Sequence, residues 1–333
     1  MLPAQAAPRR LAAPLLATFL FSAAVYSCSE SEAGKPLIGV ALADAKSPFS
    51  TACLAAMERG AEGRALLAVM DGKGEGAAQL GQVDKLISRG AKTLVVAPPT
   101  AAEAAAVIAR AKAANVPLVL LGEEPRIEEL RSWDKLLFVG HAASRAGPAL
   151  ASVLAASWGS VPASDRDRNG RMRLAFAGLS SGSADEERNL DCLASLDGAG
   201  IEVDGLSARG AEAIAALASR PGSRVEAVAA ADAASAAAAA DALGPPARGL
   251  SPVPVVAFLP GRPAPSLSEL SGLRLAGAVA GDPAAVGSAA LDAAYALAFG
   301  RDPAEAGFEL IDGKSLILPY AEVRSPDFDP PAN

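Results

Sequence analysis

The feature that most constrains this chain is a regular alternation of short apolar runs with stretches of helical composition. The apolar runs predict strands at residues 37–43, 66–70, 93–97, 116–121, 138–140, 172–177, 225–230, 253–258 and 273–279. The intervening stretches predict helices at residues 49–64, 77–89, 101–114, 142–158, 185–196 and 230–243. Continuous apolar strands separated by helices are typical of parallel strands buried on both faces. The sequence therefore predicts an α/β fold built from doubly wound parallel sheets.

The pattern restarts after Gly140, which indicates two successive α/β halves joined by a hinge. A length of 333 residues allows about two domains of ordinary size. The formal net charge of −7 argues against a nucleic-acid-binding surface, which needs a basic stripe to neutralise phosphates. The single histidine, His141, excludes any metal or catalytic centre that requires several histidines. We expect His141 to be a packed or hinge residue rather than a catalyst.

The N-terminal segment has the composition of an export signal. Arg9 and Arg10 precede an apolar stretch at residues 11–26 that is short for a membrane span. The stretch ends in Val25-Tyr26-Ser27-Cys28, which resembles the lipobox of bacterial lipoproteins. That resemblance implies a signal peptide at residues 1–27, a lipidated Cys28 and a tether at residues 28–36. Ordinary cleavage nearby and an uncleaved anchor are the alternatives, and each of the three implies an exported protein.

Two motif matches suggest an enzyme, but their context does not support one. Residues 72–77 fit G-x-G-x-x-A, yet no acidic residue follows about 20 positions later, as a dinucleotide site requires. Residues 178–182 fit the G-x-S-x-G nucleophile elbow, but no histidine follows Ser180 to act as its base. We therefore expect no enzyme. Cys53 and Cys192 are expected to be buried thiols, with a disulfide between them as the alternative.

A short acidic loop is more specific. Residues 165–172 read D-x-D-x-N-G-x-φ, the front half of an EF-hand calcium loop. Asp165, Asp167 and Asn169 would offer side-chain oxygens, and Arg171 a main-chain carbonyl. The twelfth position is Phe176 instead of the bidentate glutamate, so a distant carboxylate would have to complete the site. The alternative is a surface turn rich in Asp and Asn.

A longer set of motifs resembles the sugar-binding type I periplasmic binding proteins, and within them the bacterial glucose/galactose-binding proteins. These motifs are Gln79-x-x-Gln82-Val83-Asp84-Lys85-Leu86-Ile87, Thr93-Leu94-Val95-Val96-Ala97-Pro98, Asn115-Val116-Pro117, Glu124-Pro125, Phe138-Val139-Gly140, the 165–170 loop and Pro319-Tyr320. The resemblance implies two lobes, at residues 37–141 with 282–318 and at residues 142–281 with 319–333. It also implies three crossings between the lobes, near residues 140–142, 281–282 and 319–320.

The resemblance further implies a structural Ca²⁺ ion in one lobe. Glu226 matches the family's closing bidentate ligand, which completes the set of Asp165, Asp167, Asn169 and Arg171. One position departs from the family, because Arg173 replaces a glutamine ligand. A cation cannot coordinate calcium, so we expect either weaker binding or a water in that place.

The sugar site departs further from the family. Phe49 matches the first stacking aromatic and Arg188 the hydroxyl-binding arginine, while the second aromatic and most polar partners have no counterpart. The positions that match lost partners are Ser47, Gly122, Gly182, Ala184, Ala231 or Asp232, Leu259 and Gly281. Each lost hydrogen bond is worth about 0.5–1.5 kcal/mol, so tight glucose binding is not expected. The remaining polar contacts would come from Arg188, Ser47, Asp185 and Asp232.

The leading hypothesis is a monomeric solute-binding lipoprotein with altered carbohydrate specificity that serves separate ABC permease and ATPase subunits. It would be anchored by lipid in the bacterial cell envelope and face the periplasm. The alternative hypothesis is an envelope scaffold or sensor partner that has lost small-molecule binding.

Overall fold

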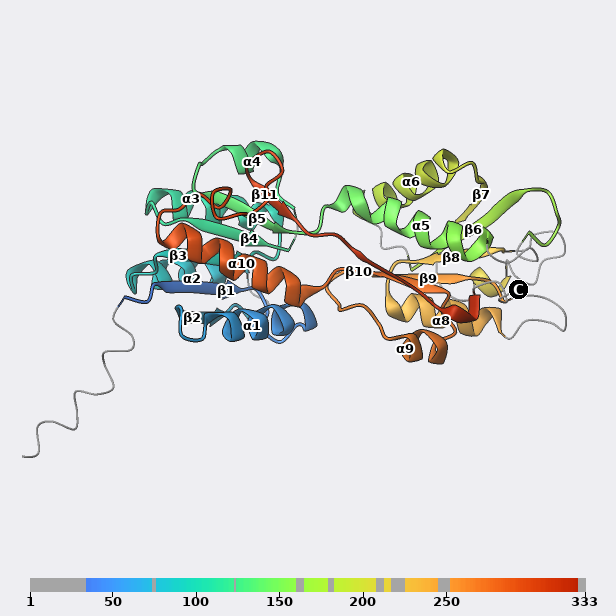
Figure 1. Cartoon of the computed structure of the whole chain (residues 1–333), viewed down its shortest axis with the longest axis horizontal. Coiled ribbons are helices and arrows are strands. Elements are labelled where there is room, and N and C mark those ends of the chain that lie inside the picture. The colour runs from blue at the N-terminus through green and yellow to red at the C-terminus, as the bar shows by residue number, and fades with distance from the viewer. Residues whose placement is uncertain are drawn as a thin grey trace, which may run out of the picture. The chain divides into compact units, whose positions relative to one another are not determined.

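The computed structural model describes residues 34–73, 76–122, 124–159, 165–178, 183–207, 213–216, 225–244 and 252–328. The chain divides into two units, Met1–Lys35 and Pro36–Asn333. The second unit contains two six-stranded sheets with helices around them (Figure 1). Cys28, the predicted lipidation site, lies outside the described residues. Within the described part of the chain, no helix combines the length and apolar character needed to cross a bilayer.

The first sheet is entirely parallel and has the strand order β11-β5-β4-β3-β1-β2. Its strands are β1 (Leu37–Leu42), β2 (Leu66–Asp71), β3 (Thr93–Ala97), β4 (Leu118–Leu121), β5 (Leu136–Gly140) and β11 (Ser315–Ile317). Every residue of β3, β4 and β5 is buried, because helices cover both faces of this sheet.

Five helices cover the first sheet: α1 (Pro48–Ala61), α2 (Gly76–Ser88), α3 (Ala101–Ala113), α4 (Ile127–Arg131) and α10 (Pro283–Ala298). Helices α1 and α10 build the core on one face, and α2, α3 and α4 build the core on the other. At Gly287 an added Cβ would lie 2.3 Å from the Cys53 carbonyl oxygen, so glycine allows α10 to approach α1 closely. The Cys53 thiol donates to the carbonyl of Pro283 at 2.9 Å across the same contact.

The second sheet has the strand order β12-β10-β9-β8-β6-β7. Its strands are β6 (Arg171–Ala177), β7 (Glu202–Ser207), β8 (Ala227–Ala230), β9 (Val255–Leu259), β10 (Gly277–Ala280) and β12 (Ala321–Arg324). Its covering helices are α5 (Ala146–Gly159) and α6 (Ser183–Gly198) on one face, and α8 (Ala233–Leu243) and α9 (Leu267–Gly272) on the other. The edge strand β12 runs antiparallel to β10, so this sheet is mostly rather than wholly parallel.

The predicted α/β fold with doubly wound sheets is confirmed, with differences in its parts. The sequence did not predict β7, β11, β12, α4, α9 or α10. The strand predicted at 273–279 is shorter, because Leu273 ends α9 and the extended segment begins at Gly277. The chain passes between the two sheets after β5, after β10 and after β11, and the predicted crossings at 140–142, 281–282 and 319–320 lie in these connections.

The strand order creates one switch point in each sheet. In the first sheet β2 and β3 lie on opposite sides of β1, and in the second β7 and β8 lie on opposite sides of β6. Loops leaving neighbouring strands at a switch point diverge, which opens a crevice outside their carboxyl ends where ligands bind in open α/β sheets. The carboxyl ends of β1, β6 and β8 are therefore where a ligand site is expected.

Candidate functional site

The predicted ligand-binding residues follow the strands that flank the two switch points. Ser47 and Phe49 come after β1, Asp185 and Arg188 after β6, and Asp232 directly after β8. All five thus belong to segments at carboxyl ends of parallel strands, where this type of sheet binds small molecules. The structure assigns them different contacts.

A pocket of about 290 Å³ lies at the carboxyl ends of β4, β5 and β9, beside the start of α1 that follows β1. Its lining is mostly apolar and includes the aromatic rings of Phe49, His141 and Tyr320. The lining residues are Phe49, Gly122, Gly140, His141, Pro260, Gly261, Val286 and Tyr320. Phe49 is half-buried and packs against Gly261, where an added Cβ would lie 3.2 Å from its ring. Gly261 also has a φ of +71°, so both its backbone and its neighbour favour glycine.

His141 and Tyr320 form the aromatic part of the pocket wall. Their rings stack with centroids 4.8 Å apart, and Tyr320 also meets Phe258 at 5.6 Å. His141 Nδ1 lies 3.0 Å from the Leu318 carbonyl oxygen, so Nδ1 carries the proton and Nε2 of the neutral ring is an acceptor. Nε2 is buried, packs against Gly281, and has no hydrogen-bond partner among the described residues.

The titration of both rings is shifted by their surroundings. Burial lowers the pKa of His141, against the raising effects of the Leu318 carbonyl, Asp282 and the Pro319 backbone. Burial raises the pKa of Tyr320, and the nearby Arg188 opposes that shift. A neutral imidazole and a neutral phenol therefore face the pocket at neutral pH.

Arg188 is the one arginine whose side chain is buried in the described part of the chain, at 8% exposure. Its Nη1 donates to Asp185 Oδ1 at 2.5 Å, and its guanidinium carbon lies 4.8 Å from the centre of the Phe258 ring. Its Nε is buried and has no hydrogen-bond partner among the described residues. A buried N–H without an acceptor is costly, so this group is suited to donate to a ligand oxygen.

Ser47 and Asp232 cap helices. Ser47 Oγ accepts from the Ser50 amide at 3.1 Å at the start of α1. Asp232 Oδ1 accepts from the Ser235 amide at 2.7 Å, and its Oδ2 accepts from the Ser235 hydroxyl at 3.0 Å, at the start of α8. N-cap side chains satisfy amides that the helix itself leaves unpaired. A ligand would have to share these oxygens with the helix ends.

Of the five predicted ligand-binding residues, Phe49 is the one that lines the pocket, and roles for Ser47, Asp185, Arg188 and Asp232 stay predictions. The sequence placed His141 and Tyr320 at crossings and did not assign them to a ligand. The sequence could have indicated a ligand-binding role through the position of these residues in the predicted crossings. Segments that cross between the sheets at strand ends also border the crevice. Gly182 and Ser180 lie outside the described residues, as does the side chain of Ala184.

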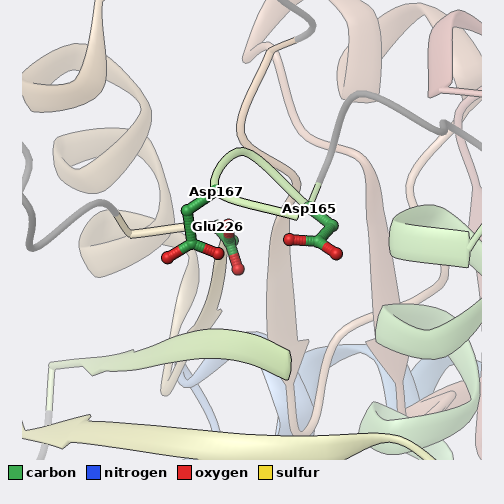
Figure 2. A group of neighbouring side chains, drawn as sticks. All are labelled: Asp165, Asp167 and Glu226. Atoms are coloured by element: carbon green, nitrogen blue, oxygen red, sulfur yellow. The ribbon is translucent and has the colours of Figure 1, made fainter. Parts of the chain in front are cut away.

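The predicted calcium loop is at the opposite end of the second sheet. Oxygens of Asp165, Asp167 and Glu226 lie within 4.8 Å of one another (Figure 2). The two aspartates precede β6 and Glu226 precedes β8, so the cluster sits at the amino ends of these strands. Strand β6 is seven residues long, about 20 Å, which separates the cluster from the pocket end.

Glu226 joins the loop to the sheet. It is 1% exposed, and its two oxygens accept from the amides of Arg166 at 2.7 Å and Arg173 at 3.1 Å. In return the Glu226 amide donates to the Arg173 carbonyl at 2.9 Å. Burial raises the pKa of Glu226, the two amides oppose this, and the Asp167 and Asp165 charges raise it further.

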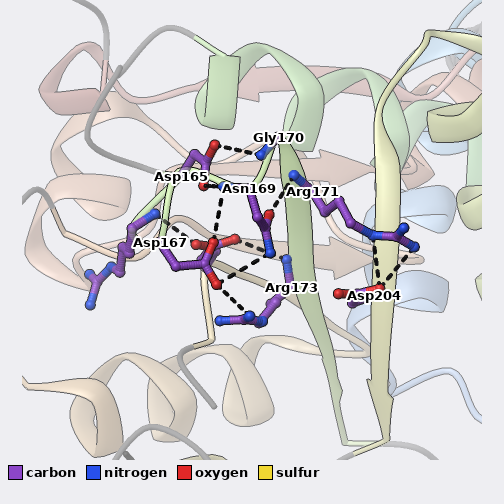
Figure 3. A network of polar contacts seen from close by, with 9 residues as sticks. Asp165, Asp167, Asn169, Gly170, Arg171, Arg173 and Asp204 are labelled. Atoms are coloured by element: carbon purple, nitrogen blue, oxygen red, sulfur yellow. Dashed lines mark hydrogen bonds and ion pairs between the residues drawn. The ribbon is translucent and has the colours of Figure 1, made fainter. Parts of the chain in front are cut away.

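The donor set fits calcium at three carboxylates but not at Arg173. The Arg173 guanidinium forms an ion pair with Asp167 Oδ2 (Figure 3). Asn169 directs its Nδ2 donor at the same oxygen, at 3.2 Å, while its Oδ1 accepts from the Arg171 amide at 2.8 Å. Calcium requires oxygen ligands, and here a cation and an N–H group face Asp167. Calcium binding at this loop therefore stays a prediction, with three carboxylates in its favour and the contacts of Asp167 against it.

The two described cysteines are free and buried, as the sequence predicted. Burial raises the pKa of Cys53 to about 12 and that of Cys192 to about 12. Cys53 lies in α1 against the first sheet and Cys192 in α6 against the second, so they belong to different cores. No disulfide joins them.

Comparisons with known proteins agree with this geometry. Residues 38–302 match the model of the periplasmic binding protein domain. The D-galactose/methyl-galactoside binding periplasmic protein MglB of Haemophilus influenzae is 27% identical over 195 residues, which are 58% of this chain and 59% of that protein. The chain thus aligns with less than two thirds of that relative's length.

Solved structures show the same fold over nearly the whole chain. A periplasmic ribose ABC transporter structure from Conexibacter woesei has a TM-score of 0.66 at 20% identity, covering 88% of this chain and 93% of that one. GanP, a glucose-galactose binding protein from Geobacillus stearothermophilus, has a TM-score of 0.61 at 14% identity, covering 90% and 99%.

Proposed function

Because the chain belongs to the periplasmic binding protein family, we propose that it is the solute-binding component of an ABC-type uptake system for a sugar or a related polyol. Membership of this family implies an exported protein, and its members are solute-binding proteins rather than enzymes. The observation that carries the proposal is the pocket at the strand carboxyl ends, bordered by Phe49, His141 and Tyr320. Separate permease and ATPase subunits would receive the ligand.

The pocket favours a ligand with a broad apolar face and few hydroxyl groups. Phe49 and the stacked pair of His141 and Tyr320 offer ring surfaces against which a sugar ring could pack. Arg188 holds an unpaired buried N–H, whereas Ser47 and Asp232 already accept hydrogen bonds from helix ends. A hexose leaving water needs a partner for each hydroxyl, so this supply of polar groups suits a deoxy sugar better than glucose.

A thermal-shift screen tests the proposal, with protein that starts after Cys28 and panels of hexoses, pentoses, deoxy sugars and polyols. A ligand at about 100 times its dissociation constant adds about 2.7 kcal/mol to the free energy of unfolding. We expect one of the smaller or deoxygenated sugars to raise the melting temperature more than glucose does. Titration calorimetry would then give its affinity.

Two variants show whether that ligand occupies this pocket. Phe49→Ala and Arg188→Gln should abolish the ligand-induced shift. Arg64→Gln is a matched control, because Arg64 also lies over an aromatic ring, that of Tyr295 at 4.5 Å, and pairs with Asp292 away from the pocket. A shift that survives in Phe49→Ala and Arg188→Gln would contradict the assignment of the pocket.

The second candidate function is an envelope scaffold or sensor partner without a small-molecule ligand. The helix-capping roles of Ser47 and Asp232 favour this second candidate. Their oxygens already accept hydrogen bonds from helix ends, which leaves fewer acceptors for the hydroxyl groups of a ligand. Silence of the protein toward every sugar, polyol, nucleoside and amino acid in the screen would support this candidate over transport.

Anchoring through Cys28 belongs to the same proposal. The compact unit begins at Pro36, the last residue of the predicted tether and eight residues after Cys28. Mass spectrometry of the protein expressed in a bacterial host should find an acylated cysteine at the mature N-terminus. Cys28→Ala should release the protein from the membrane fraction, whereas a wild-type protein that is unmodified and freely soluble would contradict lipidation.

A further inference from the structure

We propose that the Arg173 guanidinium takes the place of a calcium ion at the 165–170 loop, so that an internal cation holds the loop and the wild-type protein binds no calcium there. The inference concerns the amino end of the second sheet and does not depend on the ligand of the pocket.

The cluster needs a positive charge. Carboxylate oxygens of Asp165, Asp167 and Glu226 approach within 4.8 Å of one another, and Glu226 is 1% exposed. Like charges this close and partly removed from water repel strongly. A cation among them is the ordinary way in which proteins stabilise such a group.

Arg173 supplies that cation from the strand itself. Its side chain is 19% exposed and pairs with Asp167, which is 30% exposed, so the ion pair is partly shielded from solvent. Arg171, two residues earlier on β6, provides a contrast. Its guanidinium pairs instead with Asp204 of β7 at 3.0 Å (Figure 3) and with Glu202 of the same strand at 2.9 Å. The two arginines are alike in type and strand, but only Arg173 contacts the carboxylate cluster.

The remaining contacts close the loop without an ion. Asp165 accepts from the amides of Asn169 at 3.1 Å and Gly170 at 2.8 Å, and Glu226 accepts from two further amides. Each of the six carboxylate oxygens of the cluster accepts at least one N–H hydrogen bond. The Asn169 side chain donates to Asp167 rather than offering its oxygen to the centre. The loop is therefore arranged around N–H donors.

The test compares calcium binding by the wild type, Arg173→Gln and Arg171→Gln. Each variant loses one positive charge from β6, but only Arg173→Gln frees Asp167. We expect no binding heat and no change in melting temperature when about 1 mM calcium is added to the wild type or to Arg171→Gln. We expect Arg173→Gln to melt several degrees lower in chelator and to recover on addition of calcium but not of magnesium.

Two results would overturn the proposal. One is a wild type that binds calcium at least as tightly as Arg173→Gln does. The other is an Arg173→Gln variant whose stability in chelator equals that of the wild type, since the guanidinium would then be dispensable.

A second pair of variants keeps the test decisive if Arg173→Gln gains no calcium binding. Asp167→Asn should lower the melting temperature of the wild type, because it removes the partner of Arg173. In the Arg173→Gln background the same change should raise the melting temperature in chelator, because it removes a repelling charge while the asparagine Oδ1 can still accept from the Asn169 amide. An Asp167→Asn effect of the same sign in both backgrounds would contradict the role of Arg173 as the cation.

Discussion

The amino and carboxyl ends of the second sheet differ in how their polar side chains are hydrogen-bonded. At the amino end, three carboxylates, four backbone amides and Arg173 form a connected network around the 165–170 loop. At the carboxyl end, Asp232 caps a helix, Arg188 pairs with Asp185 and leaves its Nε unpartnered within the described residues, and the pocket lining is mostly apolar. The carboxylates of the 165–170 loop network are satisfied within the chain, whereas Arg188 Nε and His141 Nε2 are a buried donor and acceptor without partners among the described residues.

This difference shows how one scaffold separates stability from binding. Groups that are fully bonded within the chain stabilise the fold but have little left to offer a ligand. Buried groups without partners cost stability and are retained where a ligand can satisfy them. The amino end thus behaves as a structural clamp, and the carboxyl end as the place where specificity can change.

The largest effect is expected from removing Glu226. Glu226→Ala leaves the partly buried amides of Arg166 and Arg173 without the Glu226 acceptor, which should lower the free energy of unfolding by about 2–4 kcal/mol. Denaturant unfolding measures it. Glu202→Ala is the control, since Glu202 is 66% exposed and its ion pair with Arg171 is worth at most about 1 kcal/mol. Equal losses in the two variants would refute the idea that the amino end is a clamp.

Substitution of the two glycines that flank β6 allows a direct comparison of the amino and carboxyl ends of the second sheet. Gly170 and Gly178 both have a φ of +75°, but an added Cβ meets nothing within 4 Å at Gly170, whereas at Gly178 it would lie 2.0 Å from Ser235 Oγ. Gly170→Ala should therefore cost about 1 kcal/mol of backbone strain. Gly178→Ala should cost about 2–3 kcal/mol, because Ser235 and the Asp232 cap must also shift. Equal costs would mean that the start of α8 can move freely away from β6.

The sequence predicted the central strands of the two sheets better than the edge strands β7, β11 and β12. The apolar runs 93–97 and 116–121 predicted the central strands β3 and β4, which are continuous apolar segments because helices cover both of their faces. Strand β7 reads Glu-Val-Asp-Gly-Leu-Ser and β11 has three residues, so neither carries enough apolar pattern to be recognised. The antiparallel pairing of β12 with β10 depends on where the last crossing ends, which no local pattern encodes.

The candidate site was predictable in position but not in contacts. The family resemblance assigned Phe49, Arg188 and Asp232 to the ligand cleft, and in the structure each belongs to a segment that follows the carboxyl end of a strand. Yet the residue types that bind sugar hydroxyl groups are also those that cap helices. The sequence around Asp232 is compatible with either role, and in the structure Asp232 caps α8 by accepting from the Ser235 amide. Likewise, the spacing of Asp165, Asp167 and Asn169 predicted a calcium loop. The contact of Arg173 with Asp167 could not be predicted, because it depends on which face of β6 the Arg173 side chain occupies.

The smallest effect concerns His141 at the pocket end. Burial holds the pKa of His141 in the folded protein below its ordinary value, so the unfolded chain takes up the proton more readily as pH falls through about 6.5. Stability should therefore decline on acidification in the wild type, and His141→Gln should lack this contribution. The melting-temperature advantage of wild type over His141→Gln should be smaller at pH 5.5 than at pH 8, since titrating carboxylates affect both proteins alike. An advantage that grows at pH 5.5 would mean that Asp282 outweighs burial, and that the pocket end, like the amino end, accommodates a buried cation.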